Sequence, residues 1–337
     1  MKTKLWILLL FPVLTSCQKD EEEIPGNVLS KSQFYVTAIH SPNGLGDRGY
    51  NDNLYKGIRE SQLTHGFHLQ SYSPLNMNEA EQLMINWMKD SIVTGTRMLV
   101  LGSSDFEPLL RKHADQLPSP EHGEIVLLES RATDMPAYTL YLPIYGACYQ
   151  AGCIAMLFPY AHTSAVVCAN RTEGPIADGL RGFKEGFTDS NGLQLDTYYL
   201  ADDDIGYTMA DSLYRLCHTL EQNYGFVFPI CGGSNQGLIR FTREHPYTFY
   251  TAGMDVDQSD YSPKITFSVV KHIDRAISRF LQAWVNRETI PLHQRWGLSS
   301  DMVEVVASPA YKEFLGNSLE ITNKTAIHKE EAYEKTK

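Results

Sequence analysis

The sequence has no cluster of basic residues. Its 337 residues include 29 Lys and Arg against 40 Asp and Glu, a formal net charge of −11, and no Lys/Arg-rich run occurs. A nucleic-acid groove or a site for an anionic membrane surface needs such a run, so neither is an expected partner. A long apolar run is missing as well. The run near the N-terminus, residues 5–13, is far shorter than the roughly 20 residues of a membrane span.

Cysteines are few and poorly placed for a disulfide framework or a metal site. Apart from Cys17, the sequence has Cys148, Cys153, Cys168, Cys217 and Cys231. Their number is odd, none forms a Cys-x-x-Cys pair, and no histidine cluster lies beside them at zinc spacing. We therefore predict five buried thiols, no metal and no cofactor.

The N-terminus has the pattern of a secretory signal. Two lysines precede the short apolar run, and Leu-Thr-Ser-Cys (14–17) follows it, directly before the polar QKDEEE. This ending resembles a bacterial lipobox, in which Cys17 becomes the lipidated first residue of the mature protein. Residues 1–17 are thus predicted to be a signal peptide and residues 18–31 a polar tether. A buried N-terminal strand with an incidental cysteine is the alternative.

Beyond residue 31 the pattern alternates between apolar strands and helices. Strand-like runs occur at FYVTAI, FHLQSY, RMLVLG and EIVLLE, and after a helix-like segment the alternation restarts with SAVVCAN, LDTYYLA, FVFPIC and YTFYTAG. This repetition predicts an α/β fold of two similar doubly wound parallel-sheet lobes, joined by crossing segments around a shared cleft. The expected lobes are residues 32–142 plus 257–288 and residues 143–256 plus 289–320, followed by a polar tail at 321–337.

The stretch SPNGLGDRGYNDNLYKGI (41–58) contains a literal G-x-G-x-x-G after the first strand. A dinucleotide site also needs an acidic residue at the end of the second strand, where this sequence has SYSP, and Asp47 would repel a pyrophosphate. The loop fits a neutral, hydroxyl-rich, partly aromatic ligand better. Tyr50 offers a face for stacking, and Asn51 offers an amide at a helix start. In the alternative, Tyr50 only packs on its own helix and Asn51 only caps it.

Two later strand ends carry further candidates. Asp255 and Asp257 lie on alternate faces of a strand end, so one of them should point into the cleft and accept hydrogen bonds from ligand hydroxyls. Lys271, beyond the next strand, is placed to donate to another ligand oxygen. Gly232 and Gly233 end the strand FVFPIC and are expected to form a backbone-lined wall of the site. For the two aspartates, a solvated turn is the alternative.

These motifs occur in the order GDRGYNDNLYKGI, CGGSNQGL, GMDVDQ and ITFSVVKHIDRAI. Together they resemble the basic membrane protein family of nucleoside-binding lipoproteins, which are extracytoplasmic solute receptors of ABC importers with the type I periplasmic-binding fold. The resemblance spans residues 33–308. It implies that Tyr50 stacks on the base, that Asn51 bonds the base edge, and that Asp255 and Lys271 hold the ribose.

Two positions depart from the family pattern. The acidic residue that usually follows the third strand is offset, so that Asp105 and Glu107 compete for its role; Asp105 is the candidate site residue. The second lobe usually supplies a Phe shortly before a Gly-Phe pair, whereas Gly179 stands at that position here. The second stacking face is therefore unassigned.

The resemblance implies a solute-binding lipoprotein, not an enzyme, that captures a nucleoside, preferably a purine nucleoside, for an ABC permease. It is expected to be a monomer held in the cell envelope by its lipid anchor, on the periplasmic side of a membrane or on the outer-membrane surface. The alternatives are the same fold binding a sugar or another polar solute as a sensor or surface receptor, a periplasmic nucleoside hydrolase, or a scaffold with a dead cleft. No Ser-His-Asp, Cys-His or clustered carboxylate arrangement is readable from spacing, which counts against the hydrolase.

The lipobox assignment predicts the behaviour of a Cys17→Ser variant. Without the thiol no lipid can be attached, so the protein should move from the membrane to the soluble fraction or keep its signal peptide. Fractionation and intact mass of parent and variant measure this. A variant that stays with membranes as the parent does, with its signal removed, would contradict the anchor.

Overall fold

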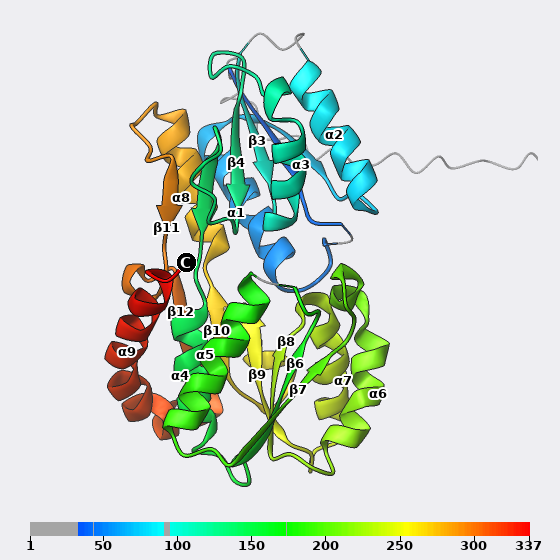
Figure 1. Cartoon of the computed structure of the whole chain (residues 1–337), viewed down its shortest axis with the longest axis vertical. Helices are drawn as coiled ribbons and strands as arrows, with labels where there is room; N and C mark the ends of the chain where they lie inside the picture. Colours follow the sequence, from blue (N-terminus) through cyan, green and yellow to red (C-terminus); the bar gives the residue numbers. More distant parts are fainter. Residues whose placement is uncertain (1–32, 43, 91–94, 173) are drawn as a thin grey trace, which may run out of the picture. The chain divides into compact units, whose positions relative to one another are not determined.

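The computed structural model describes residues 33–337 except residues 43, 91–94 and 173, and the predicted signal, Cys17 and tether lie outside this part. The described chain folds into two lobes, each built on a six-stranded sheet (Figure 1), and both lobes belong to one compact unit. None of the described helices is both long and apolar enough to cross a membrane.

The N-terminal lobe has an all-parallel sheet with the strand order β11-β5-β4-β3-β1-β2. Its strands are β1 (Phe34–Ile39), β2 (His68–Tyr72), β3 (Thr96–Leu101), β4 (Glu124–Leu128), β5 (Tyr138–Tyr141) and β11 (His293–Arg295). Its helices are α1 (Tyr50–His65), α2 (Met77–Lys89), α3 (Glu107–Lys112) and α8 (Ile273–Val285).

The C-terminal lobe repeats this order as β12-β10-β9-β8-β6-β7, with only β12 antiparallel. Its strands are β6 (Thr163–Cys168), β7 (Gln194–Tyr199), β8 (Phe226–Ile230), β9 (Tyr250–Asp255), β10 (Ile265–Lys271) and β12 (Val303–Ala307). Its helices are α4 (Tyr145–Ala155), α5 (Pro175–Asp189), α6 (Ala210–Leu220), α7 (Asn235–Glu244) and α9 (Lys312–Glu334). The predicted fold class, two doubly wound parallel-sheet lobes, is confirmed.

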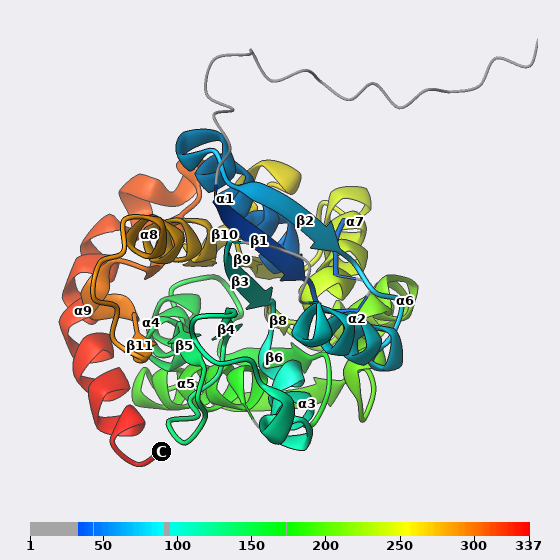
Figure 2. The ribbon, with the colours of Figure 1, turned by 90° about the horizontal axis from the view of Figure 1, so that it is seen from above.

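Alternation of side chains along the central strands gives each sheet two apolar faces. In β3, Met98 and Val100 pack in the same cluster as residues of α1 and α8, whereas Leu99 and Leu101 pack with α2 and α3. Figure 2 shows α1 and α8 side by side, and the two helices are in contact. Helices therefore cover both faces of the sheet, and only its strand ends remain for polar groups.

The lobe boundaries differ from the expected ones. β10, expected in the N-terminal lobe as part of 257–288, pairs with β9 and β12 in the C-terminal sheet. β11, expected in the C-terminal lobe as part of 289–320, pairs with β5 in the N-terminal sheet. The chain thus crosses between lobes before α4, between β10 and α8, and after β11. An apolar run shows that a strand is buried but not which sheet it joins, because strand pairing is a long-range choice.

Residues 321–337, expected as a polar tail, mostly belong to the long helix α9 instead. Its buried side chains are two apolar ones, Leu315 and Ala326, and two carboxylates, Glu330 and Glu334. Glu330 accepts hydrogen bonds from the backbone N–H groups of Gly146 (3.1 Å) and Leu298 (3.0 Å). The sequence pattern predicts a polar tail here because half of the buried residues of α9 are carboxylates, which find partners only in the folded protein.

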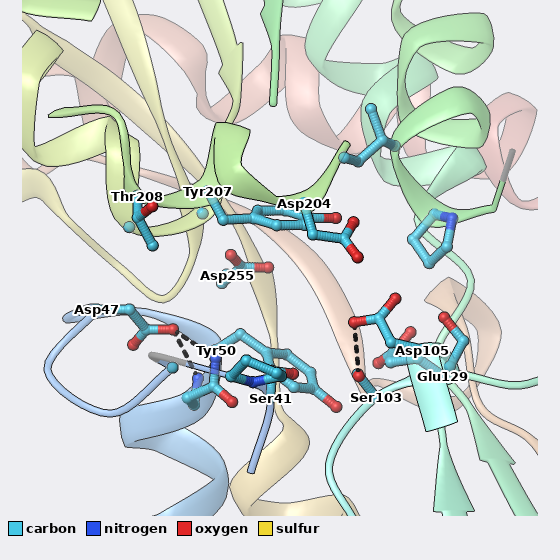
Figure 3. Close-up of a pocket in the computed structure, with 18 of the residues that line it drawn as sticks. Ser41, Asp47, Tyr50, Ser103, Asp105, Glu129, Asp204, Tyr207, Thr208 and Asp255 are labelled. Atoms are coloured by element: carbon cyan, nitrogen blue, oxygen red, sulfur yellow. Dashed lines mark hydrogen bonds between the residues drawn. The ribbon is translucent and has the colours of Figure 1, made fainter. Parts of the chain in front are cut away.

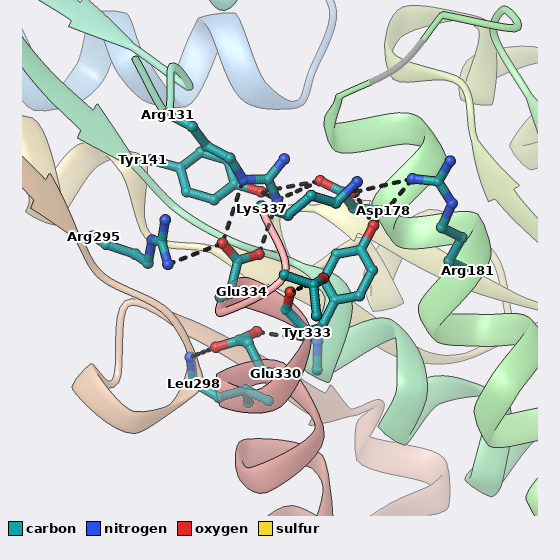
Figure 4. Close-up of polar contacts among 12 residues, drawn as sticks. Arg131, Tyr141, Asp178, Arg181, Arg295, Leu298, Glu330, Tyr333, Glu334 and Lys337 are labelled. Carbon is teal, nitrogen blue, oxygen red and sulfur yellow. Dashed lines mark hydrogen bonds and ion pairs between the residues drawn. The ribbon is translucent and has the colours of Figure 1, made fainter. Parts of the chain in front are cut away.

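The last turn of α9 takes part in an ion cluster between the lobes (Figure 4). Arg131, which follows β4, lies 2.6 Å from a carboxylate oxygen of Asp178 on α5 and 2.8 Å from one of Glu334 on α9. Asp178 is fully buried and also accepts hydrogen bonds from the hydroxyls of Tyr141 and Tyr333. One guanidinium of the N-terminal lobe therefore pairs with two buried carboxylates of the other lobe, which Arg181, Arg295 and Lys337 also approach.

Helices α4 and α5 cross at very short range because glycines lie at their contact. A Cβ atom at Gly182 or Gly186 of α5 would clash with the carbonyl oxygen of Tyr145 or Tyr149 on α4, respectively. These are backbone atoms, so the clash could be relieved only by moving one helix away from the other.

This packing predicts that Gly186→Ala destabilises the protein. Overpacking of this kind costs roughly 1–3 kcal/mol, which urea unfolding would show as a lower midpoint. Gly316→Ala in α9 is the matched control, because a Cβ there meets nothing within 4 Å, and the exchange should be neutral or stabilising by up to about 1 kcal/mol. Equal midpoints for Gly186→Ala and the parent would contradict the close contact.

Candidate functional site

The two lobes meet at a cavity of about 530 Å³. It is lined by residues that follow β1 to β5 on one side and by residues at or after the ends of β6 to β10 on the other. In both sheets the strand order reverses beside the first strand of the lobe, and the cavity lies at these two switch points, where α/β sheets bind ligands. Its size falls within the roughly 300–1,000 Å³ of small-molecule sites.

Asp47 organises the loop that begins the site. Its Oδ1 accepts a hydrogen bond from the backbone N–H of Gly49 (2.8 Å), and its Oδ2 accepts from the backbone N–H (2.9 Å) and side-chain Nδ2 (3.0 Å) of Asn51. Asp47, a candidate ligand-binding residue from the family resemblance, borders the cavity, but both of its oxygens are engaged within the loop. Its clearest effect is to turn the amide of Asn51 into a fixed orientation.

Three polar groups in the wall are buried without a hydrogen-bond partner in the described part of the chain. They are the Tyr50 hydroxyl, the Asn51 Oδ1 and the Glu129 Oε2. Asn51 and Glu129 are only 8% and 7% exposed, and all three residues line the cavity. Buried polar groups nearly always find partners, so these are groups that a polar ligand would satisfy.

A second aromatic ring lies opposite Tyr50 (Figure 3). Tyr50 is the first residue of α1, whereas Tyr207 belongs to a 3₁₀ turn of the other lobe, Asp204–Thr208, after β7. Sequence reasoning missed Tyr207 because it looked for this ring at Gly179. The available signal was the position of Tyr207 shortly after the carboxyl end of a strand.

Two glycines of the C-terminal lobe explain why the second aromatic ring comes from Tyr207. A Cβ at Gly179 would lie 3.0 Å from the Cδ1 atom of Ile144 and 3.1 Å from that of Ile230, so an aromatic side chain there would have to displace both isoleucines. Gly232, with a φ of +53°, would place a Cβ 2.8 Å from the Tyr207 ring. Gly232 and Gly233 line the cavity, and Gly232 also makes room for Tyr207.

The structure separates the two aspartates of the later motif. Asp255 lines the cavity and adopts the left-handed backbone conformation, with a φ of 69°. Burial raises the pKa of its carboxyl to about 6, although the Lys271 ammonium opposes this shift. Asp257 is exposed, does not line the cavity, and accepts a hydrogen bond from the backbone N–H of Ser259 at 3.0 Å. The expectation that Asp257 belongs to the site is therefore not met.

Lys271 forms a buried ion pair with Glu129, which sequence reasoning also missed. Nζ of Lys271, at the end of β10, lies 2.8 Å from Oε1 of Glu129, directly after β4. The same ammonium is 5.2 Å from the centroid of the Tyr50 ring. Burial raises the pKa of the Glu129 carboxyl, and Lys271 opposes the rise. Glu129 was recognisable only as the residue that ends the run EIVLLE.

The charge of the cavity is strongly negative. Its lining includes one cation, Lys271, and the carboxylates Asp47, Asp105, Glu129, Asp204 and Asp255. Glu107, the competing candidate at the third strand, is bonded instead to Arg111 (2.8 Å) and Ser130 (2.7 Å). No group of three or more His, Cys, Asp or Glu residues suited to a metal ion occurs within the described ranges. The arrangement favours a neutral or cationic ligand rich in hydrogen-bond donors over an anionic one.

The comparisons with known proteins agree with this architecture. The family model for PnrA-like ABC transporter substrate-binding proteins matches residues 146–336. Basic membrane protein C of Borreliella burgdorferi (strain N40) is 24% identical over 300 residues, which cover 83% of this chain and 82% of that protein.

Solved structures share the fold at low identity. A solute-binding protein of an ABC transporter system from Aeropyrum pernix K1 superposes with a TM-score of 0.68 at 15% identity, covering 89% of this chain and 86% of that one. An ABC transporter periplasmic solute binding protein from Actinobacillus succinogenes 130z, with bound D-allose, gives 0.62 at 11% identity, covering 83% and 99%. The fold is therefore that of type I periplasmic binding proteins.

The raised pKa of Asp255 predicts how stability depends on pH. An unfolded aspartate titrates near 3.8 and the folded one near 6, so the folded state binds more protons in this window and loses stability as the pH rises through it. The Asp255→Asn variant has no ionisable carboxyl at this position, so it lacks this pH-dependent loss of stability. Asparagine also adopts the left-handed backbone conformation more readily than most residues. At about pH 7.5 the exchange should stabilise the ligand-free protein by on the order of 1–3 kcal/mol, and the gain should fade toward about pH 4.

Urea unfolding at several pH values measures this effect. Asp257→Asn, the same exchange two residues away at an exposed position, should change little. A gain from Asp255→Asn that is equal at both ends of the pH range would contradict the assigned titration.

Proposed function

The chain belongs to the family of PnrA-like ABC transporter substrate-binding proteins, and from this premise we propose that its cleft captures a nucleoside for an ABC importer. A purine nucleoside is the proposed preferred ligand. Binding takes place outside the cytoplasm, as in the family, and the protein releases its ligand unchanged. We further propose that the protein is a monomer held in the cell envelope through lipid on Cys17.

The observation that carries this proposal is the pair of tyrosines on opposite walls of the cavity. Tyr50 comes from the N-terminal lobe and Tyr207 from the C-terminal lobe (Figure 3). Two rings that face one gap favour a flat aromatic ligand, because stacking on both faces removes both from water. A ligand held this way also joins the two lobes.

Polar groups beside the rings match the remainder of a nucleoside. Asp255 offers a carboxylate for ribose hydroxyls, and Lys271 offers N–H donors to ligand oxygens. Asn51, held by Asp47, presents its unpaired Oδ1 for a donor on the base edge. The rings and Asn51 are thus proposed to bind the base, and Asp255 and Lys271 the ribose, and all of these residues line one cavity.

Removing either ring should weaken nucleoside binding. Tyr50→Ala and Tyr207→Ala are each expected to cost roughly 1–3 kcal/mol, about 5- to 150-fold in affinity, whereas Tyr207→Phe keeps the stacking face and should cost little. Titration calorimetry with adenosine and inosine measures the affinities. Tyr247→Ala is the matched control, because Tyr247 is 99% exposed and does not line the cavity.

The same titrations separate the competing functions. D-Allose, glucose and ribose are tested beside the nucleosides, and chromatography of the recovered ligand detects hydrolysis. Binding of a sugar without any nucleoside would replace the proposed ligand class, and release of free base would replace the receptor by a hydrolase. Full nucleoside affinity in folded Tyr50→Ala and Tyr207→Ala variants would contradict the stacking site.

A further inference from the structure

The end of α9 is fixed to the C-terminal lobe by two side chains (Figure 4). Glu330 accepts hydrogen bonds from the backbone N–H groups of Gly146, at the start of α4, and Leu298, in the turn before β12. The ring of Tyr333 stacks on that of Tyr145, the first residue of α4, with 3.9 Å between the ring centroids. These contacts set the position of the helix end without any group of the N-terminal lobe.

Glu334, the next residue of α9, contacts the other lobe. Its Oε1 lies 2.8 Å from a guanidinium nitrogen of Arg131, and its Oε2 lies 3.2 Å from one of Arg295. Arg131 follows β4 and Arg295 ends β11, and both strands belong to the N-terminal sheet. One carboxylate of the C-terminal lobe is therefore held between two guanidinium groups of the N-terminal lobe.

The acidic groups of this contact are buried. The side chain of Glu334 is only 5% exposed, and that of Asp178, which pairs with Arg131 at 2.6 Å, is fully buried. Asp178 has two further cations within its own lobe, Arg181 and Lys337, each at 3.7 Å. Within the described ranges, the cations that contact Glu334 come only from the N-terminal lobe. Separation of the lobes at this point would remove both of them, which is strongly unfavourable for a buried carboxylate.

The contact shares a short segment with the wall of the cavity. Glu129, two residues before Arg131, lines the cavity and pairs with Lys271. The arrangement of the lobes in which Glu334 meets its arginines is thus the same one in which the residues of the cavity meet. A group that favours this arrangement also favours an enclosed ligand.

We propose that Glu330, Tyr333 and Glu334 form a latch between the lobes. Glu330 and Tyr333 hold the latch on the C-terminal lobe, and Glu334 binds the N-terminal lobe and favours the enclosed arrangement. The latch makes the open form rarer in the ligand-free protein and slows the release of a bound solute. This inference goes beyond the proposed function, because none of the three side chains lines the cavity and the latch acts on any solute held there.

Glu334→Gln tests the latch, since it keeps the size of the side chain and removes the charge that the two arginines share. Small-angle X-ray scattering of the ligand-free full chain should give a larger radius of gyration for this variant than for the parent. Both proteins carry Cys17→Ser, so that no lipid or detergent contributes to the scattering. Arg295→Gln should have the same effect from the other lobe, and Arg295→Lys, which keeps the charge, should bring the radius back toward that of the parent.

Glu331→Gln is the matched control. It makes the same exchange at the next residue of α9, where the side chain is 54% exposed and lies 3.9 Å from His328 of the same helix, and it should leave the radius unchanged. Urea unfolding of all variants shows whether they fold. Equal radii for the parent, Glu334→Gln and Arg295→Gln would overturn the latch, and so would a lower urea midpoint without any change in radius.

Release of adenosine, followed by stopped flow, gives a second measurement. Adenosine should leave Glu334→Gln at least about fivefold faster than the parent, whereas Glu331→Gln should release it at the parent rate. Equal rates from Glu334→Gln and the parent would overturn the latch. If the folded parent does not bind adenosine or inosine, the proposed function fails, and the scattering of the ligand-free proteins still decides whether the latch exists.

Discussion

One buried ion pair, between Lys271 and Glu129, holds the floor of the cleft in place. Lys271 ends β10 in one sheet and Glu129 follows β4 in the other, so a contact of 2.8 Å joins the carboxyl ends of two sheets. Neither group could stay charged there alone, because the loss of hydration is compensated only by its partner. The ammonium in turn lies near the ring of Tyr50 and acts on the carboxyl of Asp255. The geometry of the binding residues therefore depends on this pair.

Two residues beyond Glu129, the same segment ties the lobes together a second time. Arg131 contacts Asp178 at the start of α5 and Glu334 in the last turn of α9. The lobes cannot separate here without breaking an ion pair that is largely withdrawn from water. Because Glu129 lines the cavity and Arg131 holds α9, the C-terminal helix is joined to the ligand site by a chain of only three residues. The C-terminal helix α9 therefore takes part in the contact between the lobes as well as in packing.

Two carboxylates that line the cavity are held in energetically unfavourable states. Asp255 and Glu129 both adopt left-handed backbone conformations, with φ of 69° and 60°, and burial raises the pKa of both carboxyls. Backbone strain and buried carboxyls with raised pKa values persist where a surrounding fold enforces them, and they are typical of functional sites. A donor-rich ligand relieves the charge, whereas a phosphate would add to it.

The amino-acid sequence by itself determined the repeated strand–helix pattern, counted against a dinucleotide site, and supplied the binding candidates Tyr50, Asn51, Asp255 and Lys271. Each of these follows from local information, namely periodicity, turn residues and the ends of apolar runs. The tertiary structure decided which sheet β10 and β11 join, that the polar C-terminal segment is a docked helix, and that Tyr207, Glu129 and Asp204 face the cavity. These features depend on pairing between residues distant in sequence, and a pattern of apolar and polar residues does not specify which partner a strand or a buried carboxylate will find.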